Sequence, residues 1–88
     1  METKYLKINS ADNVAVAITT LSAGEKITVD GKDIVLNEEI PAGHKFALQD
    51  FAEGENVIKY GFPIGHATAD AVPGTWMHTH NILSLIHI

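Results

Sequence analysis

The chain has 88 residues, 45% of them hydrophobic and 19% charged, and its formal net charge at pH 7 is −5, which fits one domain with a modest core. Cysteine is absent, which excludes disulfides and thiolate metal sites, and all six basic residues are lysines scattered among acids, so neither nucleic acid nor an anionic membrane is an expected partner. No apolar run approaches the roughly 18 residues of a membrane span, and the N-terminus METKYLKINS lacks the apolar core of a signal peptide, so we expect a cytoplasmic location.

The first half of the chain predicts short strands separated by turns. Lys4–Asn9 alternates apolar and polar residues, which favours a strand. Val14–Leu21 is rich in β-branched residues and almost wholly apolar, as is typical of a strand that is buried on both faces. Glu25–Val29 and Asp33–Leu36 flank an Asp-Gly pair, and this pattern predicts a hairpin.

The second half of the chain continues this pattern. Strands are predicted over 44–48, 56–60 and 75–82, and one helical or 3₁₀ turn over 49–54. Gly61, Pro63 and Gly65 predict tight turns between the last two of these strands. Turn signals thus recur about every 8–12 residues, which indicates a small all-β barrel or sandwich-like domain.

We find no tandem repeat in the sequence, but there is a weaker echo. IPAGHKFAL and VPGTWMHTH each carry a turn with proline and glycine that leads into a strand with histidine. The echo suggests that these two segments converge at one end of the fold.

Histidines are concentrated near the C-terminal end of the chain. Successive residues of a strand point to opposite faces, so Trp76, His78 and His80 are expected to share one side. Such a His-x-His pair occurs in metal sites, but it supplies only two ligands. The other ligands would have to come from another chain or from His44, His66 and Asp70. We therefore do not expect this chain to hold a metal ion alone.

A second polar group lies where a turn meets a strand. His44 and Lys45 adjoin each other after Gly43, and a lysine beside an imidazole can bind a carboxylate or take part in proton transfer. The alternative is an ordinary solvated turn. The sequence contains neither a nucleotide-binding glycine loop nor a nucleophile motif.

Four segments in order resemble one known family. They are DNVAVA (Asp12–Ala17), IPAGHKFAL (Ile40–Leu48), GENVIKYGFPIGHAT (Gly54–Thr68) and GTWMHTHN (Gly74–Asn81). Together they are similar to the N-terminal domain of the altronate/galactarate dehydratase family, over residues 4–82. The resemblance implies a SAF domain, an all-β fold of the β-clip type, with short helical turns.

The resemblance also implies a function. Members of this family are hydro-lyases that convert an aldonate or aldarate such as altronate or galactarate to a 2-keto-3-deoxy acid with a divalent metal, iron above all. The expected function is therefore that of a domain flanking the active site of a large catalytic region, without activity or a metal of its own. The alternative is a free-standing small subunit or ligand-binding module that partners a separate large lyase subunit, as the sulfolactate sulfo-lyase small subunit does. A self-contained metal-binding protein is a third reading that rests on the histidines alone.

Carried over position by position, the resemblance assigns substrate binding to five residues. They are His44, Lys45, His78, His80 and Asn81. Lysine is suited to pair with the carboxylate of a sugar acid, while histidine and asparagine are suited to bind hydroxyls or relay protons. No catalytic residue and no metal ligand is assigned to this chain.

The last six residues depart from the family pattern. LSLIHI (residues 83–88) stands where a polar linker is expected, and it matches the translation of a sequencing-adapter-like reading frame. We expect 83–88 to be a non-native or linker tail, so that His87 is not counted among functional histidines. The alternative is a genuine apolar strand.

Overall fold

The structure is a computed structural model that describes residues 3–84, and it confirms the predicted all-β class. No helix occurs within this range, so none in it could span a membrane. The strands are β1 (Tyr5–Leu6), β2 (Val14–Ala17), β3 (Lys26–Val29), β4 (Lys32–Val35), β5 (Lys45–Ala47), β6 (Asn56–Lys59), β7 (Phe62–Ala67), β8 (Trp76–Met77) and β9 (Ile82–Ser84).

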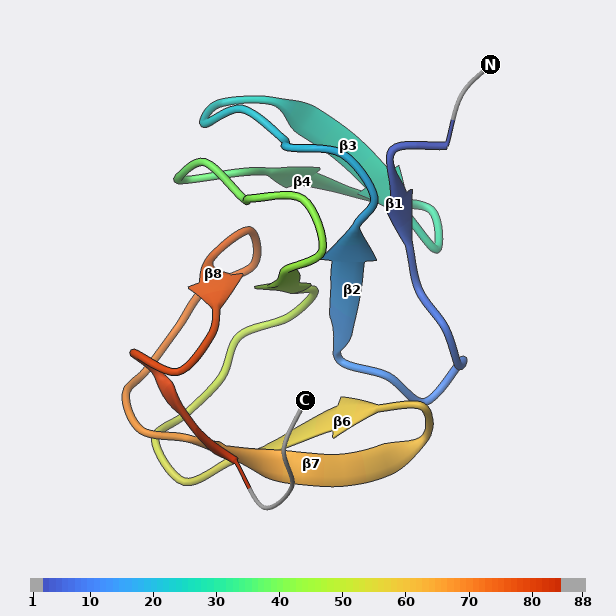
Figure 1. The fold of residues 1–88 in the computed structure, drawn as a ribbon. Helices are drawn as coiled ribbons and strands as arrows, with labels where there is room; N and C mark the ends of the chain where they lie inside the picture. Colours follow the sequence, from blue (N-terminus) through green and yellow to red (C-terminus); the bar gives the residue numbers. More distant parts are fainter. Residues whose placement is uncertain (1–2, 85–88) are drawn as a thin grey trace.

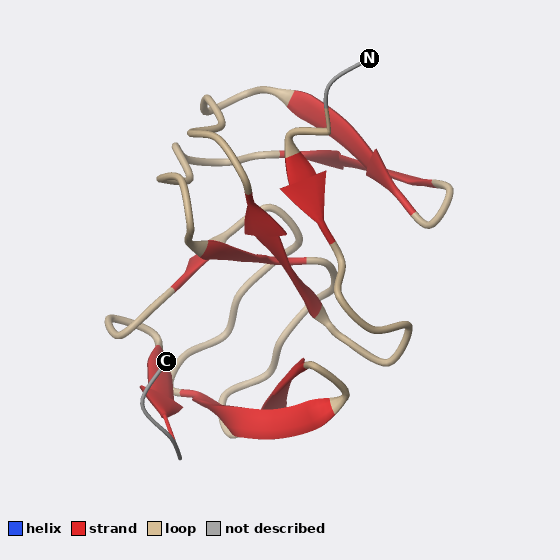
Figure 2. Cartoon of the chain, turned by 45° about the vertical axis from the view of Figure 1, so that its right-hand side comes forward, coloured by secondary structure: helices blue, strands red, loops and turns tan. Residues whose placement is uncertain are grey.

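The strands form a central sheet with a ribbon at each end. The sheet is antiparallel in the order β1-β2-β5-β8, and the β3–β4 hairpin and the β6-β7-β9 ribbon lie at opposite ends of it (Figures 1 and 2). The hairpin predicted at the Asp-Gly pair is confirmed as β3–β4. Its turn residues Asp30 and Gly31 both have positive φ, 52° and 77°, as a two-residue hairpin turn requires.

The central sheet separates two small hydrophobic cores. Alternate residues of β2 and β5 face opposite sides, so Ala15 and Phe46 join the core under the β3–β4 hairpin while Val14 and Ala47 join the other. The predicted double burial is therefore confirmed for Val14–Ala17, where three of the four residues are fully buried. Each core is small, and the shared sheet makes them one unit.

The backbone repeats itself with an offset of about 30 residues, which the sequence did not reveal. Bridge Leu21–Ile40 corresponds to bridge Phe51–Ala71. The N–H of Gly43 donates to the carbonyl of Ala17 at 2.7 Å, and its counterpart is the bond from Gly74 to Ala47 at 2.9 Å. The echo between the two proline-glycine turns is thus one part of a structural repeat. The first repeat contains β3–β4, and the second contains β6–β7.

The second repeat carries one extra residue and a longer strand. Val57 pairs with Gly65 and Ile58 pairs with Pro63, so Ile64 is the additional residue and forms a bulge. The tight turns predicted at Pro63 and Gly65 are wrong, because both lie inside β7. The glycine has a packing reason, since a Cβ at position 65 would lie 2.3 Å from the carbonyl oxygen of Leu83 on the neighbouring β9.

Two further predictions are wrong in their local form. The helical turn expected over 49–54 is absent, because the backbone of Phe51 bonds in both directions with Ala71 across the chain instead of locally. The single strand expected over 75–82 is divided into β8 and β9 by a turn.

Part of the expected tail is ordered. Leu83 and Ser84 belong to β9, where they pair with His66 and Gly65 of β7. Residues 85–88, with His87 among them, lie outside the described residues.

Candidate functional site

Four aromatic and imidazole rings gather at the edge of the central sheet where β5 and β8 meet. His44 directly precedes β5, and Trp76 lies in β8 opposite Phe46. The centroid of the His44 ring lies 4.4 Å from that of His78 and 5.4 Å from that of Trp76. The indole is stacked on His78 at 5.9 Å and lies 5.1 Å from His80. We call these four residues the ring cluster.

One hydrogen bond connects the two strands within the ring cluster. The indole Nε1–H of Trp76 donates to Nδ1 of His44 at 3.2 Å. Because this bond joins side chains 32 residues apart, it depends on the β5–β8 register, in which Phe46 pairs with Trp76. The register therefore decides which ring nitrogen of His44 remains available.

The loop 78–81 holds its two histidines through Asn81. The side-chain Oδ1 of Asn81 accepts from the N–H of His78 at 2.8 Å, and its Nδ2 donates to the carbonyl of Trp76 at 2.9 Å. The same Nδ2 contacts the sulfur of Met77 at 3.6 Å, and Asn81 is buried. This bracing ends β8 at Met77 and turns the chain so that His78 and His80 both remain beside Trp76. Ligand binding by Asn81 stays a prediction.

The first repeat supports the ring cluster from one side. Segment 37–38 contacts the start of β8: Nδ2 of Asn37 donates to the hydroxyl of Thr75 at 3.1 Å, and the N–H of Trp76 donates to Oε2 of Glu38 at 3.1 Å. The backbone of Trp76 is thus bonded on its N–H by Glu38 and on its carbonyl by Asn81. Sequence reasoning missed Glu38, since neither spacing nor residue type marks it as part of the site.

Lys45 is buried beside the ring cluster. It is 6% exposed, lies between Val16 of β2 and Met77 of β8, and its ammonium makes no ion pair or hydrogen bond with residues 3–84. Burial, and next the ammonium of Lys59, lower the pKa of Lys45 from its ordinary value. The residue as a whole is covered, but its ammonium is not a fully buried atom. A partly desolvated cation that has no partner among residues 3–84 suits an anionic group from outside the described chain.

The imidazole of His78 is also biased toward its neutral form. Partial burial is the main reason that its pKa is lowered, and the nearby His44, Lys45 and His80 lower it further. The ring cluster and Lys45 therefore present one partly desolvated ammonium and, at His78, an imidazole biased toward its neutral form. Such a set can bind the carboxylate and hydroxyl oxygens of a small polar ligand.

The structure brings together the five residues expected to bind substrate but not the additional metal-ligand candidates. His66 lies in β7 opposite Leu83, and Oδ1 of Asp70 accepts from the N–H of Glu53 at 2.9 Å. Over residues 3–84, no group of three histidine, aspartate or glutamate side chains is arranged to hold a metal ion.

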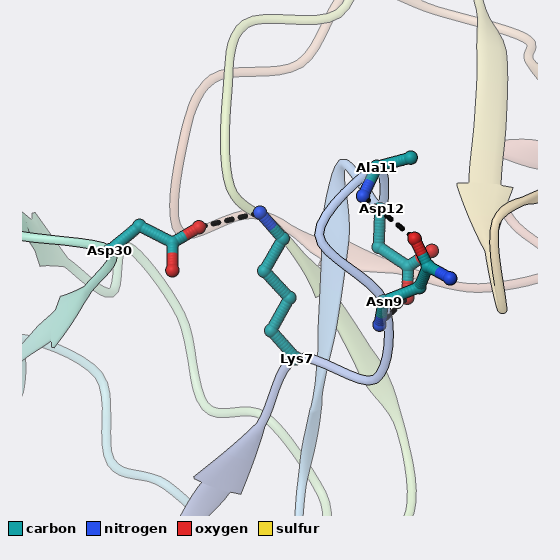
Figure 3. Close-up of polar contacts among 5 residues, drawn as sticks. All are labelled: Lys7, Asn9, Ala11, Asp12 and Asp30. Carbon is teal, nitrogen blue, oxygen red and sulfur yellow. Dashed lines mark hydrogen bonds and ion pairs between the residues drawn. The ribbon is translucent and has the colours of Figure 1, made fainter.

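A second set of polar groups lines a hollow of about 100 Å³ between the first turn and the β3–β4 hairpin. Lys7 is paired with Asp30 at 2.5 Å, and the amide of Asn9 accepts from the N–H of Ala11 at 2.9 Å (Figure 3). The buried Asp12 accepts from the backbone N–H groups of Asn9 and Gly61 at 3.0 and 2.8 Å. These hydrogen bonds and the ion pair satisfy the polar groups and connect three segments of the chain. We therefore assign a structural role to this hollow.

Comparison with known proteins identifies the family. The profile of the altronate/galactarate dehydratase SAF domain matches residues 3–85. The chain is 50% identical over 78 residues to altronate dehydratase of Escherichia coli and 42% identical over 77 residues to that of Bacillus subtilis, and these alignments cover 89% and 88% of this chain but 16% of each dehydratase. It thus spans about a sixth of the length of these relatives.

A third relative is much shorter. The chain is 36% identical over 83 residues to (2R)-sulfolactate sulfo-lyase subunit alpha of Chromohalobacter salexigens, an alignment that covers 85% of this chain and 88% of that subunit. The same domain therefore occurs both as a small part of a long chain and as most of a short one. With its β architecture and this match over nearly all its residues, the chain belongs to the altronate/galactarate dehydratase SAF domain family.

Proposed function

We propose that this chain is the N-terminal domain of a sugar-acid hydro-lyase and that it flanks the active site of a larger catalytic region. The substrate would be an aldonate or aldarate such as altronate or galactarate, converted to a 2-keto-3-deoxy acid. Two relatives named altronate dehydratase support the reaction class, at 50% and 42% identity. The observation that carries the proposal is Lys45, a largely covered lysine beside the ring cluster whose ammonium has no partner among residues 3–84.

The chemistry of the reaction explains why such a site is useful. Dehydration removes the proton next to the carboxylate and expels a neighbouring hydroxyl as water, so the substrate must be held by its carboxylate and hydroxyls. Lys45 supplies a cation for the carboxylate, and His44, His78 and His80 supply polar ring atoms for hydroxyls. We assign binding and orientation to this chain, and proton transfer to the catalytic region.

We place the divalent metal that the family resemblance implies, iron above all, in the catalytic region as well. The donor set of this chain does not fit such an ion within the described residues, because no three suitable side chains converge there. Nδ1 of His44 is moreover occupied by Trp76. No step of the proposed role passes through a metal held here.

The proposal is tested in the complete enzyme that contains this chain with its catalytic region. Lys45→Met and His78→Gln should each lower kcat/KM by about 10- to 150-fold, since a hydrogen bond to a charged group contributes about 1.5–3 kcal/mol. Lys32→Met is the matched control, because Lys32 is an exposed lysine of β4 outside the ring cluster. Unchanged kcat/KM in both site variants would refute the assignment.

A second candidate function is a free-standing small subunit that partners a separate large lyase subunit. The observation that favours it is the match to sulfolactate sulfo-lyase subunit alpha, which extends over 88% of that protein. Sequencing the genomic DNA beyond codon 82 distinguishes the two. An open frame into a large catalytic region supports the domain, whereas a nearby stop followed by a second lyase gene supports the subunit.

A further inference from the structure

The bond between Trp76 and His44 determines where the proton of a neutral His44 resides. An indole nitrogen is a donor only, so the ring nitrogen that it contacts must offer a lone pair. Trp76 donates to Nδ1 of His44 at 3.2 Å. In the neutral ring the proton must then lie on the other nitrogen, Nε2, which makes no hydrogen bond with residues 3–84.

The donor is held in place independently of His44. The backbone of Trp76 pairs with β5, donates to Glu38 at 3.1 Å and accepts from Asn81 at 2.9 Å. Its ring is partly buried against the core under the β3–β4 hairpin and is stacked on His78 with an interplanar angle of 14°. Because these contacts fix the indole, the direction of its N–H is set before any ligand binds.

We propose that Trp76 is a positioning residue that holds His44 in the Nε2–H tautomer, so that His44 presents a hydrogen-bond donor to a carboxylate or hydroxyl oxygen of the ligand. The identity of that ligand rests on the proposed function, whereas the tautomer does not. A histidine held in this way cannot accept a proton at either nitrogen without losing the bond to Trp76. His44 is therefore a donor and not a general base.

The neighbouring charged and titratable groups are consistent with this division of roles. The groups around the ring cluster are His78 and His80 from the loop, Lys45 next to His44 in the chain, and Glu38 from the first repeat. The carboxylate of Glu38 accepts from the backbone of Trp76. His78 has no ring hydrogen bond within residues 3–84 and is left as the imidazole with an available lone pair.

The tautomer can be measured directly in the ¹⁵N-labelled chain by long-range ¹H–¹⁵N correlation of the histidine rings, at a pH where they are neutral. The wild type should show His44 with Nδ1 unprotonated and Nε2 protonated. Trp76→Phe keeps an aromatic ring but removes the donor, and both tautomers of His44 should then appear. Tyr5→Phe is the control, because Tyr5 also packs on this core and the two hydrogen bonds that its hydroxyl makes with the backbone of Thr28 lie away from His44.

Several outcomes would overturn the proposal. They are a proton on Nδ1 in the wild type, an unchanged tautomer in Trp76→Phe, or an equal change in Tyr5→Phe. If Trp76→Phe does not fold, His44→Phe offers the reciprocal test. The chain has a single tryptophan, so its one indole N–H resonance should shift and exchange faster with water when the acceptor is removed. An unaffected indole resonance would also overturn the proposal.

Activity of the complete enzyme separates this inference from the proposed function. Trp76→Phe should lower kcat/KM by about 2- to 12-fold, the effect of one neutral hydrogen bond. If the tautomer is as expected but Lys45→Met and His78→Gln both leave kcat/KM unchanged, the proposed function fails and the tautomer assignment stands. If His44→Gln lowers kcat/KM but Nδ1 carries the proton, the positioning role fails and the proposed function stands.

Discussion

The two proline-glycine turns offer a matched pair of substitutions, Gly43→Ala and Gly74→Ala. The two glycines are equivalent in the repeat and have similar φ, 82° and 89°. Each donates its N–H to the last residue of a central-sheet strand, Gly43 to Ala17 of β2 at 2.7 Å and Gly74 to Ala47 of β5 at 2.9 Å. A Cβ at Gly43 meets nothing within 4 Å, whereas a Cβ at Gly74 would lie 2.5 Å from the carbonyl oxygen of Val35.

The difference between the two substitutions isolates one contact. Placing alanine at positive φ costs about 1–2 kcal/mol at either position. Only Gly74→Ala must also push the backbone of Val35 away, and such overpacking adds about 1–3 kcal/mol. A domain of 88 residues has a total stability of about 4–13 kcal/mol. Gly74→Ala should therefore remove a large share of the free energy of unfolding, and Gly43→Ala a small one.

Urea unfolding followed by circular dichroism and by the fluorescence of the single tryptophan measures both variants against the wild type. In thermal unfolding of the same proteins, the midpoint temperature of Gly74→Ala should lie at least about 4 °C below that of Gly43→Ala, the shift expected for 1 kcal/mol in a domain of this size. Equal losses in the two variants would refute the reasoning. They would mean that the approach of Val35 to Gly74 does not support the segment that leads into Trp76.

Two further predictions concern charge at the ring cluster. Lys45→Met should leave the free energy of unfolding unchanged or raise it by up to about 1 kcal/mol, because it removes a partly desolvated cation; a clear loss in urea unfolding would show that the ammonium has a stabilising partner. Since the pKa of His78 in the folded chain is lowered from 6.5, the unfolded chain binds the proton more readily, and stability should fall as the pH drops below 6.5. Unfolding from about pH 8 to about pH 5 should show a smaller loss for His78→Gln than for the wild type, and identical slopes would contradict the pKa assignment.

Local sequence patterns predicted which segments form strands better than they predicted the connections and long-range contacts between these strands. The Asp-Gly pair and the apolar run Val14–Ala17 have a single consistent structure, and both were found as expected. Gly65 was misread because its role is long-range: it lets β9 approach β7, which no local pattern shows. The repeat was missed because few side chains are shared between its copies, and the extra Ile64 shifts the second copy by one residue.

The sequence and the family resemblance predicted which residues lie together at the candidate site but not how they are arranged. The family resemblance implied that His44, Lys45, His78 and His80 act together, and three of them lie in one ring cluster with the fourth, Lys45, beside it. The expected reason, a shared strand face, was wrong because Asn81 ends β8 and folds the chain back. The bond from Trp76 to His44 depends on a pairing between β5 and β8 that only the folded chain defines.

The internal repeat explains why the ring cluster lies at this edge. Strands β5 and β8 are equivalent in the two copies, and they pair directly with each other, Phe46 opposite Trp76 and Lys45 opposite Met77. The first copy contributes His44 and Lys45 at the start of β5. The second contributes Trp76 and the histidine loop at the end of β8, which the antiparallel pairing places beside them. Backbone geometry is kept in both copies while the side chains have diverged to complementary roles, acceptor and donor. The ring cluster thus belongs to neither copy alone, and either half of the chain in isolation would lack it.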